Sequence, residues 1–468
     1  MARQRSVKYS SRRLRGWQLA ALAGAAGALA VAGCSSSTSS SGSSGTGGST
    51  APVSGGSSSA PGTATSGSIV WSASPITTNS HGDTRTVLIN AFNKVYPNIH
   101  VTLTSAPTNT DTNRATLATE ISGGSSTPDV FMGDVIWPAQ FGAHQLAVPL
   151  STYLPASYWA QFAPGLVAGA SYKGQVYGSP LFEDQGFMYY RKDLLAKEHL
   201  SPPTTWEQLE SEAQTLQKAG LVKYGFVWEG ASYEGLTCNY MEYLADASGS
   251  ATNSGYTTAT LDSAAAVKAT TFMRSLITSG VTPATVTTFQ EPQAMAIFQT
   301  GDAAFLRNWD YAYSDATTPA TGTLKTSQVG VEPMPAFAGQ PTPGFSNIGG
   351  WNMYINPHSK NVNLDLTFIK YLASQQAQTI LATKYSEIPT TTLVRGSATV
   401  KALNPVLAIV GQTKLVPRPA GTPNYPALST AIYTNVNSAL AGSTSPSAAM
   451  AAAESQANTA LSSTSGGL

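Results

Sequence analysis

The amino-acid sequence predicts an α/β protein with a parallel sheet covered by helices on both faces. From Ser68 onward, short apolar runs alternate with segments of helical periodicity, in a strand-helix-strand-helix-strand order. The length of 468 residues predicts two or more domains. Ligands of such sheets bind beyond the carboxyl ends of the strands, which is where Asp134 falls. The fold class therefore also predicts where a site would lie.

The first part of the chain supplies this alternation. In the stretch expected to form the first helix, apolar side chains recur at helical spacing from Val87 to Val95, and Pro97 then stops the helix. We expect strands at residues 69–71, 99–103 and 130–132, and helices at 84–96 and 114–122.

A second compact unit is expected to begin near Gly178. Residues 181–190 form a mixed apolar segment, and Thr205 provides an N-cap for a helix that begins with Trp206. Residues 442–468 are rich in Ala and Ser, and we expect them to be partly helical. Further expected elements are strands or extended chain at 224–228, 329–333 and 353–355, and helices at 205–219, 238–247, 263–279, 291–300, 362–374, 375–385 and 424–440.

The first 34 residues are typical of an export signal. Six basic side chains precede an apolar run of 14 residues, 19–32, which is shorter than the ~20 residues that span a bilayer. Residues 31–34, Val-Ala-Gly-Cys, resemble the lipobox of bacterial lipoproteins, in which the signal is cut before the Cys and the Cys is acylated. We therefore expect a signal peptide over 1–34 that ends at a lipidated Cys34. An ordinary secretory signal is the alternative, and the export route, Sec or twin-arginine, stays open.

The segment after this signal, residues 35–67, has neither charged nor aromatic side chains and consists mainly of Ser, Gly and Thr. Such a segment cannot bury enough apolar area to offset the entropy of ordering it. We expect a disordered linker that tethers the body to the outer face of the cell membrane, where the lipid on Cys34 is the anchor.

Charge and cysteine content argue against several classes of function. Removing the signal leaves 20 Lys and Arg against 25 Asp and Glu, so the body is mildly acidic and has no electrostatic footprint for nucleic acid. Besides Cys34 the chain has one thiol, Cys238, in an apolar and aromatic context typical of a small buried side chain. The five His residues show no HExxH-type spacing. We expect no metal, no cofactor and no internal disulfide.

Aromatic side chains stand beside carboxylates in several segments at expected strand or loop ends. These segments are residues 134–137, 182–184, 228–229, 308–311 and 349–352. A sugar presents an apolar face of C–H groups and a rim of hydroxyls, so its site needs flat aromatic surfaces and hydrogen-bond acceptors. Hydrogen bonds to charged acceptors contribute about 1.5–3 kcal/mol each. The combination favours a carbohydrate ligand.

Several blocks of sequence resemble the extracellular solute-binding proteins of ABC sugar importers, in the family's order from about residue 68 to 442. The Tyr-Arg-Lys-Asp-Leu block at 190–194 and the Pro-Thr-Thr-Trp block at 203–206 are specific for this superfamily, and the later blocks resemble its trehalose/maltose-binding branch. The blocks are 127–137, 178–184, 189–195, 203–209, 298–304, 308–309, 349–351, 418–419 and 423–425.

The resemblance implies a two-lobed periplasmic-binding-protein-like fold with a hinge and a ligand cleft between the lobes. The N-terminal lobe would consist of residues 68–178 and 331–373. The C-terminal lobe would consist of residues 179–330 and 374–468. The chain would therefore cross between the lobes three times, near these boundaries.

The resemblance also implies which residues contact the ligand. Asp134, Asp184 and Glu291 would accept hydrogen bonds from sugar hydroxyls, the two Trp residues would stack on sugar rings and the two Arg residues would donate. The expected set is Asp83, Asn109, Arg114, Asp134, Phe182, Asp184, Glu291, Trp309, Gly350, Trp351 and Arg418.

For three of these residues, ligand contact has an alternative or is in doubt. Phe182 departs from the family, in which a Tyr is common, so one hydroxyl contact is in doubt although the ring could still pack on a sugar. Asp134 could instead cap the turn that follows it, and Asp184 could pair with Arg191. These local roles are the alternatives to ligand contact for the two carboxylates.

We therefore predict a substrate-binding lipoprotein of an ABC importer, and not an enzyme. It would capture a neutral di- or oligosaccharide, similar to trehalose or maltose, by hinge closure as a monomer and deliver it to the permease subunits. A solute-binding protein for a polyol or a glycerophosphodiester is the alternative, and a phosphate would require a more basic site. A glycoside hydrolase, for which Asp134, Asp184 and Glu291 could supply paired carboxylates, fits the whole-chain pattern less well.

Overall fold

The computed structural model describes residues 65–318, 323–403 and 405–464, all of which belong to the unit Ser58–Leu468. The expected signal peptide, the lipidation of Cys34 and almost all of the expected linker lie outside the described residues. Within the described ranges, no helix is long and apolar enough to cross a bilayer.

The expected strand-helix-strand-helix-strand segment is present at the start of the fold. Strand β1 (Gly67–Ala73) pairs in parallel with β4 (Ile99–Ser105) and with β5 (Val130–Asp134). Helices α1 (Thr84–Val95) and α2 (Thr110–Ser122) connect the three strands. The prediction of a parallel sheet in the first part of the chain is therefore confirmed.

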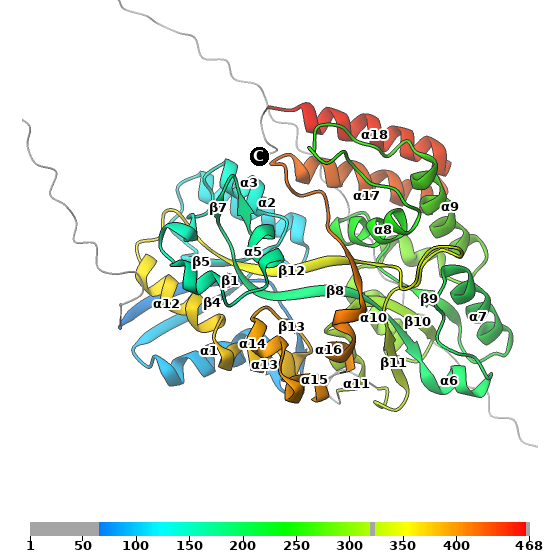
Figure 1. Ribbon diagram of the computed structural model, residues 1–468, viewed down its shortest axis with the longest axis horizontal. Helices are drawn as coiled ribbons and strands as arrows, with labels where there is room; N and C mark the ends of the chain where they lie inside the picture. Colours follow the sequence, from blue (N-terminus) through cyan, green and yellow to red (C-terminus); the bar gives the residue numbers. More distant parts are fainter. Residues whose placement is uncertain (1–64, 319–322, 404, 465–468) are drawn as a thin grey trace, which may run out of the picture. The chain divides into compact units, whose positions relative to one another are not determined.

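A long mixed sheet has the strand order β4-β1-β5-β12-β8-β10-β9 (Figure 1). Its two central strands, β8 (Ser179–Arg191) and β12 (Phe345–Ile355), pair antiparallel with each other. Because β12 also pairs with β5, and β8 with β10 (Ala303–Trp309), these two strands join the first strands to the later ones. Strand β10 is absent from the predicted elements; it pairs in parallel with β9 (Tyr224–Val227).

Shorter strands complete the edges of this sheet and form two small hairpins. Strand β8 also pairs with β11 and β13, and β12 pairs with β14. The pairs β2-β3 and β6-β7 stand apart. The bounds are β2 Thr78–Asn79, β3 Gly82–Asp83, β6 Ser171–Tyr172, β7 Gln175–Val176, β11 Val329–Glu332, β13 Ile388–Pro389 and β14 Lys414–Val416.

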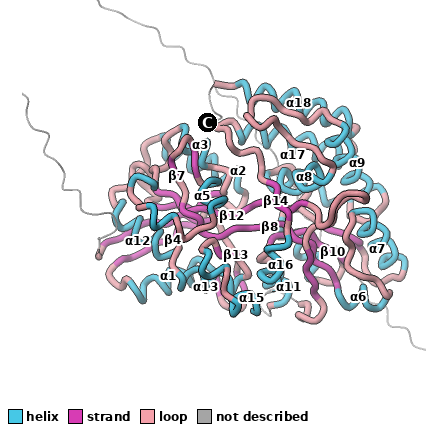
Figure 2. The backbone as a smooth tube through the Cα atoms, viewed as in Figure 1, coloured by secondary structure: helices cyan, strands magenta, loops and turns pink. Residues whose placement is uncertain are grey.

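Helices lie on both sides of the strands (Figure 2). The Thr205 side chain caps α7 as expected, and the chain ends in a pair of packed helices, α17 and α18. The expected partial helicity of the last segment is confirmed by α18. The bounds are α3 Pro138–Ala143, α4 Ala156–Trp159, α5 Pro164–Gly169, α6 Lys192–Lys197, α7 Trp206–Lys218, α8 Glu234–Asp246, α9 Ala264–Thr278, α10 Glu291–Gln299, α11 Ala312–Thr317, α12 Val362–Leu372, α13 Gln375–Tyr385, α14 Thr392–Arg395, α15 Ala398–Leu403, α16 Pro405–Ile409, α17 Tyr425–Ala441 and α18 Pro446–Ser462.

Apolar cores pack against the sheet along its length, and the core that contains Trp206 extends as far as Phe131 and Phe141. On the side of β1, Trp71 packs edge-to-face on Phe368 of α12 with ring centroids 5.2 Å apart. On the side of β9, Trp206 stacks on Tyr243 with centroids 4.2 Å apart. Of helix α13, Leu381 belongs to the core around Trp71, and Ala382 belongs to a third core.

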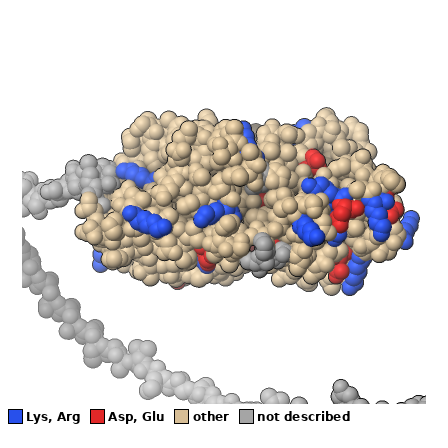
Figure 3. Space-filling view, turned by 90° about the horizontal axis from the view of Figure 1, so that it is seen from below, with Lys and Arg blue, Asp and Glu red and all other residues tan. Residues whose placement is uncertain are grey.

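The face of the molecule seen from below carries few charges. Figure 3 shows Lys and Arg side chains standing singly or in small groups over the face seen from below, with Asp and Glu side chains beside some of them. Most of this face consists of uncharged residues.

Candidate ligand-binding site

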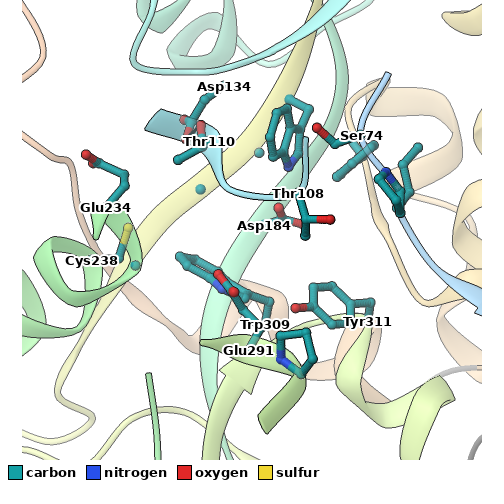
Figure 4. Close-up of a pocket in the computed structure, with 18 of the residues that line it drawn as sticks. Ser74, Thr108, Thr110, Asp134, Asp184, Glu234, Cys238, Glu291, Trp309 and Tyr311 are labelled. Carbon is teal, nitrogen blue, oxygen red and sulfur yellow. Dashed lines mark hydrogen bonds between the residues drawn. The ribbon is translucent and has the colours of Figure 1, made fainter. Parts of the chain in front are cut away.

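A cavity of about 450 Å³ lies where the ends of β5 and β10 and the middle of β8 and β12 meet the starts of α8 and α10. This volume falls within the ~300–1,000 Å³ that is usual for sites of small molecules. Figure 4 shows Asp134 and Thr110 on one side of the cavity and Trp309, Glu291 and Tyr311 on the opposite side, with Asp184 between them.

Eight of the eleven predicted site residues line this one cavity, although they come from widely separated parts of the chain. They are Asp134, Phe182, Asp184, Glu291, Trp309, Gly350, Trp351 and Arg418.

Three predicted residues do not line the cavity, and two of them cap helices. Asp83 caps α1 and forms an ion pair of 2.6 Å with Arg85. The Asn109 side chain accepts from the backbone N–H of Thr112 at 3.0 Å, so α2 begins at Thr110 and not at the expected residue 114. Both side chains therefore cap helices here, and their expected ligand contacts stay predictions.

The third residue outside the lining is Arg114, on the first turns of α2. Its Nη1 donates to Gln140 Oε1 at 3.3 Å. Burial lowers the pKa of Arg114, and the nearby carboxylates of Asp111 and Glu234 oppose this. The expected donation from Arg114 to a ligand stays a prediction.

Strand register explains why β8 and β12 both contribute to the site. Trp351 lies opposite Asp134 on one side and opposite Phe182 on the other, and Gly349 lies opposite Asp184. The pairing of β12 with both neighbours thus brings distant sequence blocks to one place.

Gly350 is required at its position by the backbone. Its φ is +124°, a conformation that residues with side chains rarely adopt. A Cβ at this position would lie 2.6 Å from the carbonyl oxygen of Phe182 and 3.0 Å from Cα of Glu183. Strands β12 and β8 can therefore approach closely at the cavity only with glycine here.

Arg418 binds two carboxylates at one end of the cavity. Its guanidinium donates to Asp134 at 2.7 and 3.1 Å and to Glu234 at 2.9 Å. Asp134 also accepts from the backbone N–H of Ile136 at 3.2 Å, so it caps the turn that follows while it lines the cavity. Burial raises the pKa of Glu234 to about 7, although Arg418 opposes the rise.

Asp184 belongs to a group of three buried carboxyl side chains, of which Asp184 and Glu387 line the cavity. One carboxylate oxygen from each of Asp184, Asp310 and Glu387 lies within 4.8 Å of the other two. Burial raises the pKa of Asp184 to about 7, and burial together with the neighbouring carboxylates raises the pKa of Asp310 and Glu387 well above the usual carboxyl value. The alternative pairing of Asp184 with Arg191 is wrong, because Arg191 forms its ion pair of 2.7 Å with Asp193.

Within the described ranges, these three carboxyl groups also lie close enough together to bind a metal ion. Metal ligands must be deprotonated. Without a cation, the raised pKa values of all three indicate that the group shares protons and can form hydrogen bonds with hydroxyl groups.

Several residues of the cavity were not predicted. Tyr233 and Glu234 place an aromatic ring beside a carboxylate, which is the signal used elsewhere in the sequence and could have found them. Cys238 lines the cavity as a buried thiol whose pKa burial raises, and its expected burial is confirmed. Tyr311 and Gly349 lie in two of the segments singled out in the sequence, 308–311 and 349–352, but were not selected as site residues. The remaining unpredicted lining residues stand outside those segments and are Ser74, Pro75, Ile76, Thr108, Thr110, Met132, Gly235, Pro292, Met295, Gln299, Asp315 and Glu387.

The model of the bacterial extracellular solute-binding protein family matches residues 77–379, and the chain belongs to this family. A probable ABC transporter-binding protein of Deinococcus radiodurans is 32% identical over 367 residues, which are 76% of this chain and 85% of the relative.

Solved structures give the same assignment. Maltose-bound MalE3 of T. maritima has a TM-score of 0.77 and 31% identity, and the match covers 84% of this chain and 99% of that chain. The GacH receptor of Streptomyces glaucescens, solved unliganded and with acarbose, has a TM-score of 0.74 and 25% identity over 85% of this chain and 98% of that chain. The fold is the two-lobed periplasmic-binding-protein fold. Members of the family are binding proteins of ABC transporters and not enzymes, which corrects the hydrolase alternative.

Proposed function

We propose that the protein captures a neutral di- or oligosaccharide, similar to trehalose or maltose, for an ABC importer. One observation carries this proposal: aromatic rings and carboxylates from distant sequence blocks converge on a single cavity of about 450 Å³. The rings of Trp309 and Trp351 would stack on sugar faces. The carboxyl groups of Asp184 and Glu291 would accept hydrogen bonds from hydroxyls, and discrimination between sugars follows from leaving such groups unpaired.

The charges of the cavity support a neutral ligand over a phosphate. The lining carries six carboxyl side chains, and Arg418 is the cation among the described lining residues. Its guanidinium is already bonded to Asp134 and Glu234. An anionic glycerophosphodiester would therefore meet acidic groups without a free cation to offset them.

We further propose that capture proceeds by hinge closure of the lobes 68–178 with 331–373 and 179–330 with 374–468. The ligand would favour the closed form only by its higher affinity for that form. The closed complex would dock as a monomer on the permease subunits of the transporter. A lipid on Cys34 would hold the protein at the outer face of the membrane through the linker 35–67.

A thermal-shift screen of the purified full chain tests the proposal. A ligand that binds the folded chain raises the apparent stability by mass action, by about 2.7 kcal/mol at one hundred times its dissociation constant. We expect the largest shifts with trehalose, maltose or longer glucosides. Shifts confined to polyols or to glycerophosphodiesters would reject the saccharide assignment and favour those ligands.

A further inference from the structure

A fully buried charged network lies directly behind the cavity. Arg307 is 1% exposed, and its guanidinium donates to Glu242 at 2.6 and 3.1 Å and to Glu229 at 2.9 Å. None of these three residues lines the cavity. Burying an ion pair adds little to stability when compared with apolar residues of the same volume. The network therefore needs an explanation other than stability.

The guanidinium of Arg307 lies against the indole of Trp309. Its Cζ is 4.2 Å from the ring centroid, which is within the range of a cation–π interaction. The two residues are two positions apart on β10, so their side chains share one face of the sheet. Trp309 lines the cavity whereas Arg307 does not, so the guanidinium supports the ring from the protein side.

Two glycines leave room for the guanidinium of Arg307 and the indole of Trp309. Gly186 pairs across the sheet with Trp309, and a Cβ on it would lie 2.6 Å from Arg307 Nη2 and 2.2 Å from Glu242 Oε1. A Cβ on Gly349 would lie 2.8 Å from Cζ3 of the indole. The ring is therefore bounded by the guanidinium and by the backbone of β12.

The position of the guanidinium is fixed from several elements. Glu229 follows β9, and Glu242 lies on α8. Glu242 Oε1 also accepts from the backbone N–H of Asn347 on β12 at 3.0 Å, and Asn347 precedes Gly349 by two residues. The same carboxylate thus holds both the cation and the strand that border the ring.

We propose that Arg307 is a positioning residue that fixes the indole of Trp309 in the orientation that stacks on a saccharide ring. The proposal rests on the proposed function for its ligand, while the orientation of the ring is a property of the free protein. The two parts can therefore be tested separately.

The first test observes the ring without any ligand, by fluorine NMR of the full chain labelled with 5-fluorotryptophan. Trp309→Phe assigns the resonance. Because Arg307→Met alone would leave two buried carboxylates unpaired and endanger folding, the main variant is Arg307→Met with Glu229→Gln and Glu242→Gln. We expect the Trp309 resonance to shift and to broaden or split. An unchanged resonance in this variant would overturn the proposal.

A second variant keeps every charge. Gly186→Ala displaces the guanidinium by its added methyl group and should shift the same resonance. Arg191→Met, which removes an ion pair whose two residues do not line the cavity, is the matched control and should leave the resonance unchanged. A resonance that responds to Arg191→Met as strongly as to Gly186→Ala would show a general loosening of the fold and contradict a specific role of Arg307.

The second test measures binding of maltose and trehalose by calorimetry. We expect the triple variant and Gly186→Ala each to weaken binding about 10-fold, the order expected for a lost cation–π contact, and Arg191→Met to leave it unchanged. Unchanged affinity together with a shifted resonance would show that the ring orientation does not govern binding. If the unmodified protein binds neither sugar, the proposed function fails, and the resonance still decides whether Arg307 positions the ring.

Discussion

Arg418 joins two carboxylates from distant parts of the chain, so its replacement tests the electrostatics of the cavity. The side chains of Arg418, Asp134 and Glu234 are 2%, 9% and 2% exposed. Arg418→Met keeps an unbranched apolar stem and removes every donor of the guanidinium. The variant therefore leaves two buried carboxylates without their counter-charge.

The expected loss of stability follows from this geometry. Removing one partner of a buried ion pair destabilises a protein by about 3–5 kcal/mol. Glu234 keeps a hydrogen bond from Ser429 at 2.7 Å, and Asp134 keeps one from the backbone of Ile136 at 3.2 Å. Because both carboxylates retain a donor, we expect a loss near the lower end, about 3 kcal/mol at pH 8.

The loss should depend on pH in a defined direction. Burial raises the pKa of Glu234 to about 7, and Arg418 opposes this rise, so the variant should have a still higher value. A carboxyl group whose pKa is raised by folding is neutral in the folded chain at low pH. Its cost appears as the pH rises through the folded pKa. The destabilisation by Arg418→Met should therefore shrink between pH 8 and pH 5.

Urea unfolding of the full chain at both pH values measures these quantities. Arg191→Met is the matched control, since its partner Asp193 is 35% exposed, and we expect a loss of about 1 kcal/mol or less. A loss below about 1 kcal/mol for Arg418→Met at pH 8, or an equal loss at pH 5, would refute the role assigned to Arg418.

Four further predictions concern the ligand, the backbone and the anchor. Trp309→Ala should weaken saccharide binding about 30-fold, as for a buried aromatic hot spot, while the control Trp159→Ala should leave binding unchanged. Equal dissociation constants for the two variants in calorimetry would show that Trp309 is not part of the site. Burial raises the pKa of Asp184 to about 7, so this side chain becomes an anion, and a stronger hydrogen-bond acceptor, between pH 6 and pH 8. Saccharide affinity should therefore rise over this range, and Asp184→Asn should abolish the pH dependence. Gly350→Ala should lower the free energy of unfolding by about 1–3 kcal/mol through backbone strain, and a change below the error of urea titration would contradict this. Cys34→Ala should release the protein from membranes and abolish labelling by radioactive palmitate, and unchanged membrane association would reject the lipid anchor.

The start of the fold could be predicted because its signals are local. Apolar spacing, Pro97 and the N-cap Thr205 mark helices α1 and α7 within one or two residues. The long central strands carry weaker signals. All thirteen residues of β8 are buried, so no alternation of apolar and polar side chains is available, and Gly349 and Gly350 weaken the strand signal of β12.

Predicting the site from the sequence had a similar limit. Residues within blocks of adjacent aromatic and acidic side chains, such as Trp309 and Asp184, could be selected. Ser74 and Thr108 lie in loops whose side chains carry no distinctive signal. The burial of Arg307 between two carboxylates depends on packing among β9, β10 and α8, which no local pattern reveals.

A crystal structure of the protein with the saccharide that gives the largest thermal shift tests the central claim most directly. We predict one sugar ring lying flat against the indole of Trp309, with hydroxyls bonded to Asp184 and within reach of Glu291. A saccharide bound elsewhere on the molecule, with these side chains untouched, would contradict the account.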